Sequence, residues 1–91
     1  MSERIRIRLL GLHLAYIDKG LVRKFESTCK VINLNSWIRE QAYNDFKVKF
    51  YSEDSLDDFK NILEKNYYDG IGDWLREKMR LAILEKERLG D

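Results

Sequence analysis

The chain has 91 residues, enough for one domain over residues 1–91 and too few for a second core or a large multi-substrate enzyme, since domains usually span about 50 to 250 residues. Its 44 % hydrophobic and 36 % charged residues are typical of a folded globular domain and exclude a disordered chain. The 17 Lys and Arg residues nearly balance 16 Asp and Glu residues, so the net charge of +1 gives no global attraction to nucleic acids or anionic membranes.

The N-terminal part predicts a strand over residues 4–10 and a helix over residues 19–30. In the strand, three apolar residues alternate with three arginines, the period of two that is typical of a half-buried strand. These residues are Ile5, Ile7 and Leu9 on one face and Arg4, Arg6 and Arg8 on the other. The alternation then changes phase, which predicts a bulge or a bend near Gly11. Asp18 is the expected N-cap of the helix, in which apolar residues recur at spacings of three and four.

The middle of the chain predicts two strands that pair as a hairpin. Residues 32–39 carry apolar and branched side chains without helical periodicity, and the turn-forming residues 43–45 follow them. Residues 46–50 then alternate aromatic or branched side chains with lysines, the clearest strand pattern in the sequence. We expect these two strands to be antiparallel neighbours.

Two helices are predicted in the C-terminal part. Ser55 and Asp58 resemble a capping box at the start of a helix over residues 55–66. The glycines of residues 67–72 separate it from a last helix over residues 73–88. The apolar residues of this last helix cover more than one stripe. Either one side faces the core and another faces a partner, or the core itself requires a broad apolar face.

The predicted order is β-α-β-β-α-α, an α+β fold with a small, mainly antiparallel sheet and helices on one face. It corresponds to an incomplete split βαβ arrangement. Residues 66–72 are long enough for only a stub of the fourth strand that would complete the sheet.

Three short segments resemble the acylphosphatase family. They are Gly20-Leu21-Val22-Arg23, Ser36-Trp37-Ile38-Arg39, and Phe46-Lys47-Val48-Lys49-Phe50 followed by Ser52-Glu53-Asp54-Ser55-Leu56. The resemblance covers about residues 5–66 and implies a ferredoxin-like fold, with Arg23 in place of the arginine that holds the acyl phosphate. The family's water-orienting asparagine is matched by Glu40, whose carboxylate would repel a phosphate. Its glycine-rich loop is replaced by residues 13–19, so we expect no catalysis and no catalytic residue.

Metal and nucleophile chemistry has few candidates in this sequence. One cysteine, Cys29, and one histidine, His13, allow neither a disulfide framework nor a known zinc spacing. Cys29 falls on the apolar face of its predicted helix, where we expect a buried and inert thiol. The carboxylates Glu53, Asp54, Asp57 and Asp58 lie at a helix start, where acidic residues complement the helix dipole. We expect no metal and no cofactor.

The sequence also carries no segment that suggests export or membrane insertion. The N-terminal residues lack the apolar run of a signal peptide, and no stretch approaches the roughly 18 apolar residues of a membrane span. We therefore expect a cytoplasmic protein with no membrane partner.

Nucleic-acid binding is the first functional alternative. The arginines of the first strand share a face at two-residue spacing, so they could contact successive phosphates. The expected binding residues are Arg4, Arg6, Arg8, Arg23, Lys47 and Lys49, with Tyr51, Tyr67 or Tyr68 stacking on bases. A solvated basic face that discourages edge aggregation would explain the same pattern.

The leading hypothesis is a small non-catalytic interaction or regulatory protein that docks on a larger protein or on a second copy of itself. The last helix carries more apolar surface than one core-facing stripe needs, and Trp and Tyr often anchor interfaces. The expected interface residues are Trp74, Leu81, Leu84, Tyr67 and Tyr68. A divergent acylphosphatase-like hydrolase that uses Arg23 is the second alternative.

Overall fold

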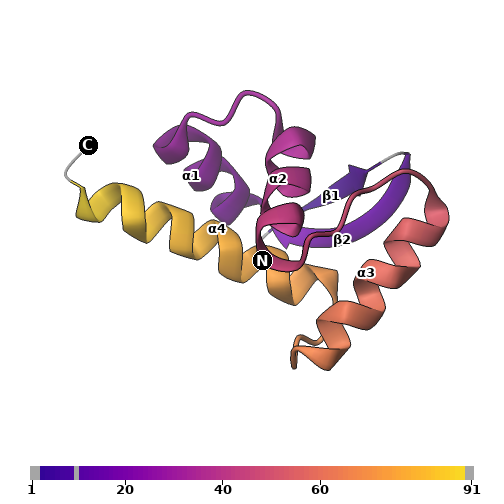
Figure 1. Cartoon of the computed structure of the whole chain (residues 1–91). Coiled ribbons are helices and arrows are strands. Elements are labelled where there is room, and N and C mark those ends of the chain that lie inside the picture. The colour runs from indigo at the N-terminus through magenta and orange to yellow at the C-terminus, as the bar shows by residue number, and fades with distance from the viewer. Residues whose placement is uncertain (1–2, 10, 90–91) are drawn as a thin grey trace.

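A computed structural model describes residues 3–9 and 11–89 and has an α+β fold (Figure 1). The described residues form a two-stranded antiparallel sheet and four helices. Their bounds are Arg4–Leu9 (β1), Leu12–Asp18 (β2), Lys19–Cys29 (α1), Leu34–Phe46 (α2), Glu53–Lys65 (α3) and Ile71–Arg88 (α4). The α+β class is confirmed, but the order is β-β-α-α-α-α. The ferredoxin-like arrangement is not confirmed, because the described residues contain only two strands.

The strands β1 and β2 form a hairpin around Gly11, whose positive φ of 74° suits a tight turn. The predicted bend near Gly11 is therefore a reversal of the chain. The predicted first strand is confirmed up to Leu9, while Leu10 lies outside the described residues.

A bulge in β2 sets which side chains face the core. Arg8 pairs with His13, but the preceding Ile7 pairs with Ala15, so Leu14 has no opposite residue. As a result Leu14 and Ala15 are both buried although they are neighbours. The bulge lies three residues beyond Gly11, where the change of phase in the sequence had suggested one.

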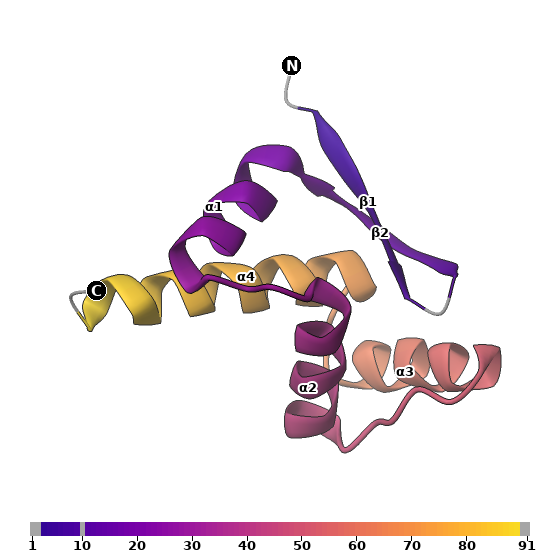
Figure 2. The same cartoon turned by 90° about the horizontal axis from the view of Figure 1, so that it is seen from above.

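Helix α1 agrees with its prediction. The Asp18 side chain caps it by accepting a hydrogen bond of 3.2 Å from the Leu21 backbone N–H. Val22 and Phe25 are buried one turn apart on the face toward the core. Helices α1 and α4 pack against each other and against β2, so one face of the hairpin is covered (Figure 2).

The prediction of a strand over residues 32–39 is wrong, because this segment begins helix α2. Asn33 caps the helix by accepting a hydrogen bond of 3.1 Å from the Ser36 backbone N–H. Ile38 and Ala42 are fully buried at a spacing of four, with Trp37 partly buried beside them. The ring of Trp37 lies 4.4 Å from that of Phe25 in α1.

The prediction of a strand over residues 46–50 is also wrong. Phe46 ends α2, and residues 47–50 form a linker without a strand partner. Val48 and Phe50 are buried, and Phe50 meets Phe59 of α3 edge to face at 5.3 Å. The alternation of apolar residues and lysines therefore reflects a linker that buries every second side chain.

The two C-terminal helices are confirmed, and each begins two residues earlier than predicted. Ser52 occupies the N-cap of α3, so Ser55 does not form the predicted capping box; its hydroxyl accepts a hydrogen bond from the Tyr51 backbone N–H at 3.2 Å. Residues 66–70 form turns, bends and irregular backbone, and residues 71–72 begin α4, so the predicted stub of a further strand over residues 66–72 is absent. No helix within the described part of the chain is long and apolar enough to cross a membrane.

Candidate functional site

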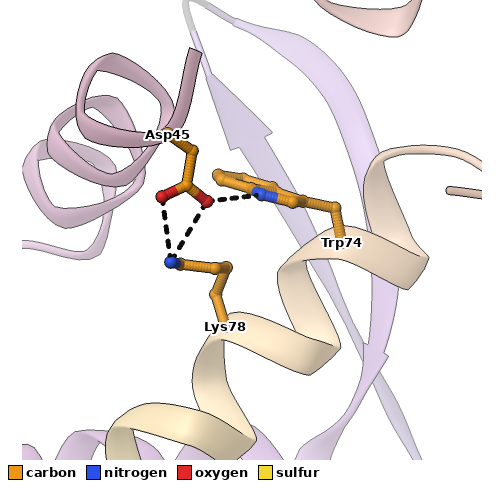
Figure 3. A network of polar contacts seen from close by, with 3 residues as sticks. All are labelled: Asp45, Trp74 and Lys78. Atoms are coloured by element: carbon orange, nitrogen blue, oxygen red, sulfur yellow. Dashed lines mark hydrogen bonds and ion pairs between the residues drawn. The ribbon is translucent and has the colours of Figure 1, made fainter. Parts of the chain in front are cut away.

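The structure places Trp74 in the core. Its side chain is 0 % exposed and lies against the rings of Phe46 and Phe59, with centroids 6.3 and 5.0 Å away. The indole Nε1 donates a hydrogen bond of 3.2 Å to Asp45 near the end of α2 (Figure 3). Trp74 therefore holds α4 to its own domain, and no partner can reach this expected interface anchor.

Asp45 joins α2 to α4 through a second contact. Its carboxylate oxygens lie 3.2 and 3.1 Å from the Nζ of Lys78, and the two side chains are only 27 % and 20 % exposed (Figure 3). Sequence reasoning missed this cluster. A buried indole N–H needs an acceptor, but the sequence does not show which of 16 carboxylates supplies it.

The C-terminal half of α4 exposes apolar side chains on the side away from the core. Leu81 and Leu84, which we name the α4 apolar patch, are 50 % and 62 % exposed, whereas Met79 and Ile83 on the same helix are buried. A shallow groove of about 570 Å³ runs along the patch, lined by Lys78, Leu81, Leu84, Glu85 and Arg88. Two neighbouring exposed leucines beside a groove make this the candidate docking surface of α4.

The two expected interface tyrosines precede α4 and differ in their surroundings. Tyr67 is 98 % exposed in a turn with a left-handed φ of 66°. Tyr68 is half-buried. Burial, and to a lesser extent a hydrogen bond to Glu77, raises the pKa of its hydroxyl. This bond ties Tyr68 to Glu77 of α4, one turn before Leu81.

The exposed face of the hairpin gathers basic and aromatic side chains. Arg6 pairs with Tyr16 across the strands, and its Nε donates a hydrogen bond of 3.2 Å to His13 Nδ1. The rings of His13 and Tyr16 lie 4.8 Å apart, and Tyr16 is 51 % exposed. We name Arg4, Arg6, Arg8, His13 and Tyr16 the hairpin basic face. Sequence reasoning found its arginines and missed its rings, because the bulge at Leu14 is what places both rings on this side.

The other predicted basic residues lie on other elements. Arg23 is exposed on α1, and Lys47 and Lys49 belong to the linker after α2. The amino groups of these two lysines lie 4.9 and 5.4 Å from the centre of the Tyr43 ring. No described contact joins any of the three to the hairpin basic face. Tyr51, named as a stacking residue, is 79 % exposed at the end of this linker.

The structure brings no metal or nucleophile set together among the residues it describes. No group of three His, Cys, Asp or Glu side chains there could hold a metal ion. Cys29 is partly buried at the end of α1. Burial raises the pKa of its thiol, and the positive charge of Lys86 lowers it by a smaller amount. His13 belongs to the hairpin basic face, on a different element. Asp54, Asp57 and Asp58 are exposed on α3, and the Glu53 side chain lies outside the described structure.

The residues at the family's arginine and asparagine positions lie on two different helices. Arg23 is exposed on α1 and Glu40 is exposed on α2. The residues that replace the glycine-rich loop form most of β2. The expectation that the chain has no hydrolase activity remains a prediction.

Comparison with known proteins gives no relative from which a role could be transferred. The chain matches no protein-family model, no curated protein and no solved structure.

Proposed function

We propose that the chain is a small interaction protein that docks through the α4 apolar patch onto an α-helix of a protein partner. The observation that carries this proposal is the exposure of Leu81 and Leu84 by 50 % and 62 % on a helix whose opposite face is buried. Because the patch is bordered by a groove and by charged side chains, it has the apolar centre and polar rim of an interface.

The spacing of residues along α4 supports a helix as the docked element. Glu77, Leu81, Leu84 and Arg88 follow one another at intervals of four, three and four residues. This is the spacing of the seam along which two helices pack their side chains together. A partner helix laid along the groove would remove both leucines from water.

Site-specific photocrosslinking in the cells that produce the protein tests this function. A benzophenone side chain replaces Leu84, and the matched control carries it at the exposed position of Asp57 on α3. We expect a defined crosslinked protein from position 84 only, and we expect Leu81→Ser to remove it. No product at position 84, or equal products from both positions, would contradict the proposal.

The hairpin basic face favours a second candidate function, binding of single-stranded nucleic acid. Arg6 lies opposite the exposed Tyr16 and Arg8 lies opposite His13, so phosphate contacts and a stacking surface occur together on one small sheet. The chain as a whole is nearly neutral, which makes this local cluster the source of any attraction.

Fluorescence polarisation with a short labelled oligouridylate tests this second function. We expect Arg6→Gln to weaken binding and to lower the salt slope by about 0.7, the contribution of one phosphate contact on a single strand. Tyr16→Ala should weaken binding while Tyr16→Phe preserves it, since stacking needs only the ring. The control Arg23→Gln changes a cation on α1 and should have no effect. Unchanged affinity in Arg6→Gln would exclude this surface.

A further inference from the structure

We infer that the helix docked on the α4 apolar patch is α4 of a second copy of this chain, packed antiparallel. The inference rests on the proposed function, because it requires the patch to be a docking surface, and it adds the identity of the partner. It comes from the order of charges along the exposed side of α4. When a second α4 runs in the opposite direction, acidic residues of one helix face basic residues of the other.

The centre of the interface follows from a two-fold axis between Leu81 and Leu84. In an antiparallel pair, Leu81 of each copy then faces Leu84 of the other. The same symmetry places Glu77 of each copy opposite Arg88 of the other, since these two residues lie equally far from the axis. The four leucines thus lie between two ion pairs, one at each end of the interface.

On one flank of this seam, Arg80 directly precedes Leu81 and Glu87 directly precedes Arg88, so Arg80 of one copy lies across from Glu87 of the other. This pair joins opposite charges and occurs twice by symmetry. Lys78, on the other flank, is already held by Asp45 of its own chain. Among the described residues, Glu87 makes a long contact of 3.8 Å with Lys24, and both side chains are more than half exposed. Glu87 is therefore accessible to a second cation.

A parallel pair of the same helices would be repulsive at both ends. It would place Glu77 of one copy against Glu77 of the other, and Arg88 of one copy against Arg88 of the other. Like charges held at a helix interface oppose association, so the charge order selects the antiparallel orientation.

The extent of α4 agrees with this arrangement. The helix ends at Arg88, so the second copy would end opposite Glu77 and stop before the turn in which Trp74 is covered by α3. In both views the C-terminal half of α4 projects past α3 and has α1 beside it (Figures 1 and 2). The overlap of residues 77–88 is short, so we expect a reversible dimer.

Exchange of charges between the two ends tests the inference. Glu77→Arg alone and Arg88→Glu alone each place like charges together in an antiparallel homodimer. We expect sedimentation equilibrium to show the wild-type chain near twice its 10.9 kDa and each variant near 10.9 kDa. A mixture of the two variants restores both opposite pairs, so it should recover the dimer. The double variant should also recover it.

Control variants keep the test interpretable. Lys60→Glu reverses an exposed charge on α3 and should leave the dimer intact, and circular dichroism should show native helix content in every variant. A wild-type chain that stays monomeric, or a mixture of variants that fails to associate, overturns the antiparallel dimer. If photocrosslinking at position 84 then captures a different protein, the docking function stands and only the identity of the partner is wrong.

Discussion

At the scale of single residues, the Asp45 carboxylate is the polar group on which the packing of α4 depends. It accepts the only hydrogen bond described for the Trp74 indole, which is fully buried. We expect Asp45→Ala to lower the free energy of unfolding by about 1–3 kcal/mol, since a buried N–H then loses its acceptor. Asp45→Asn should cost less, because an amide oxygen still accepts this bond. Urea unfolding measures both variants, and equal losses would instead assign the effect to the ion pair with Lys78.

Gly70 has a backbone conformation that residues with a Cβ atom rarely adopt. Its φ of 118° and ψ of 179° lie in a region that essentially only glycine adopts, and an added Cβ would meet no atom within 4 Å. Gly70→Ala should therefore destabilise the fold through backbone strain alone, by about 1–3 kcal/mol. Gly11→Ala, at a φ of 74°, provides the comparison and should cost about 1–2 kcal/mol. Thermal denaturation that finds Gly70→Ala as stable as the wild type would contradict this geometry.

At the scale of elements, the sequence predicted helices α1, α3 and α4 but not α2. Helix α1 has a capping aspartate and a clear stripe, so both its bounds and its buried face followed from the pattern. Helix α2 did not follow from its pattern, because residues 32–39 show no helical periodicity and α2 buries only Ile38 and Ala42 completely. The linker after α2 alternates like a strand but pairs with nothing. Local alternation predicts burial, and it cannot show whether a neighbouring strand exists.

A proline scan distinguishes the observed helix from the predicted strand in this segment. Glu40 is exposed in the middle of α2, where proline would remove a helical hydrogen bond and clash with the preceding turn. We expect Glu40→Pro to cost about 3 kcal/mol or more, while Glu40→Ala leaves stability unchanged or slightly higher. Chemical unfolding monitored by the fluorescence of Trp37 and Trp74 reports both. Tolerance of proline at this position would contradict the helix.

At the scale of the whole molecule, the candidate surfaces depend on packing that the sequence does not display. We expected Leu81, Leu84 and Trp74 to form one interface. In the structure Phe59 of α3 packs on Trp74 and covers it, whereas both leucines are exposed. Likewise Arg6 joins Tyr16 only because the chain reverses at Gly11. The residue types were informative in both cases. Their grouping required the tertiary arrangement.

The antiparallel dimer links association to folding. Only the folded chain presents α4 with Leu81 and Leu84 on one side, so dimerisation draws the equilibrium away from the unfolded state. Above the dissociation constant we expect the melting temperature to rise with protein concentration, by about 4–8 °C for each ~1 kcal/mol gained per chain. Leu84→Lys buries a charge against the other copy, so its melting temperature should not depend on concentration. Calorimetry over a hundredfold range of concentration measures this difference, and parallel behaviour of the two proteins would exclude a dimer formed through the α4 apolar patch.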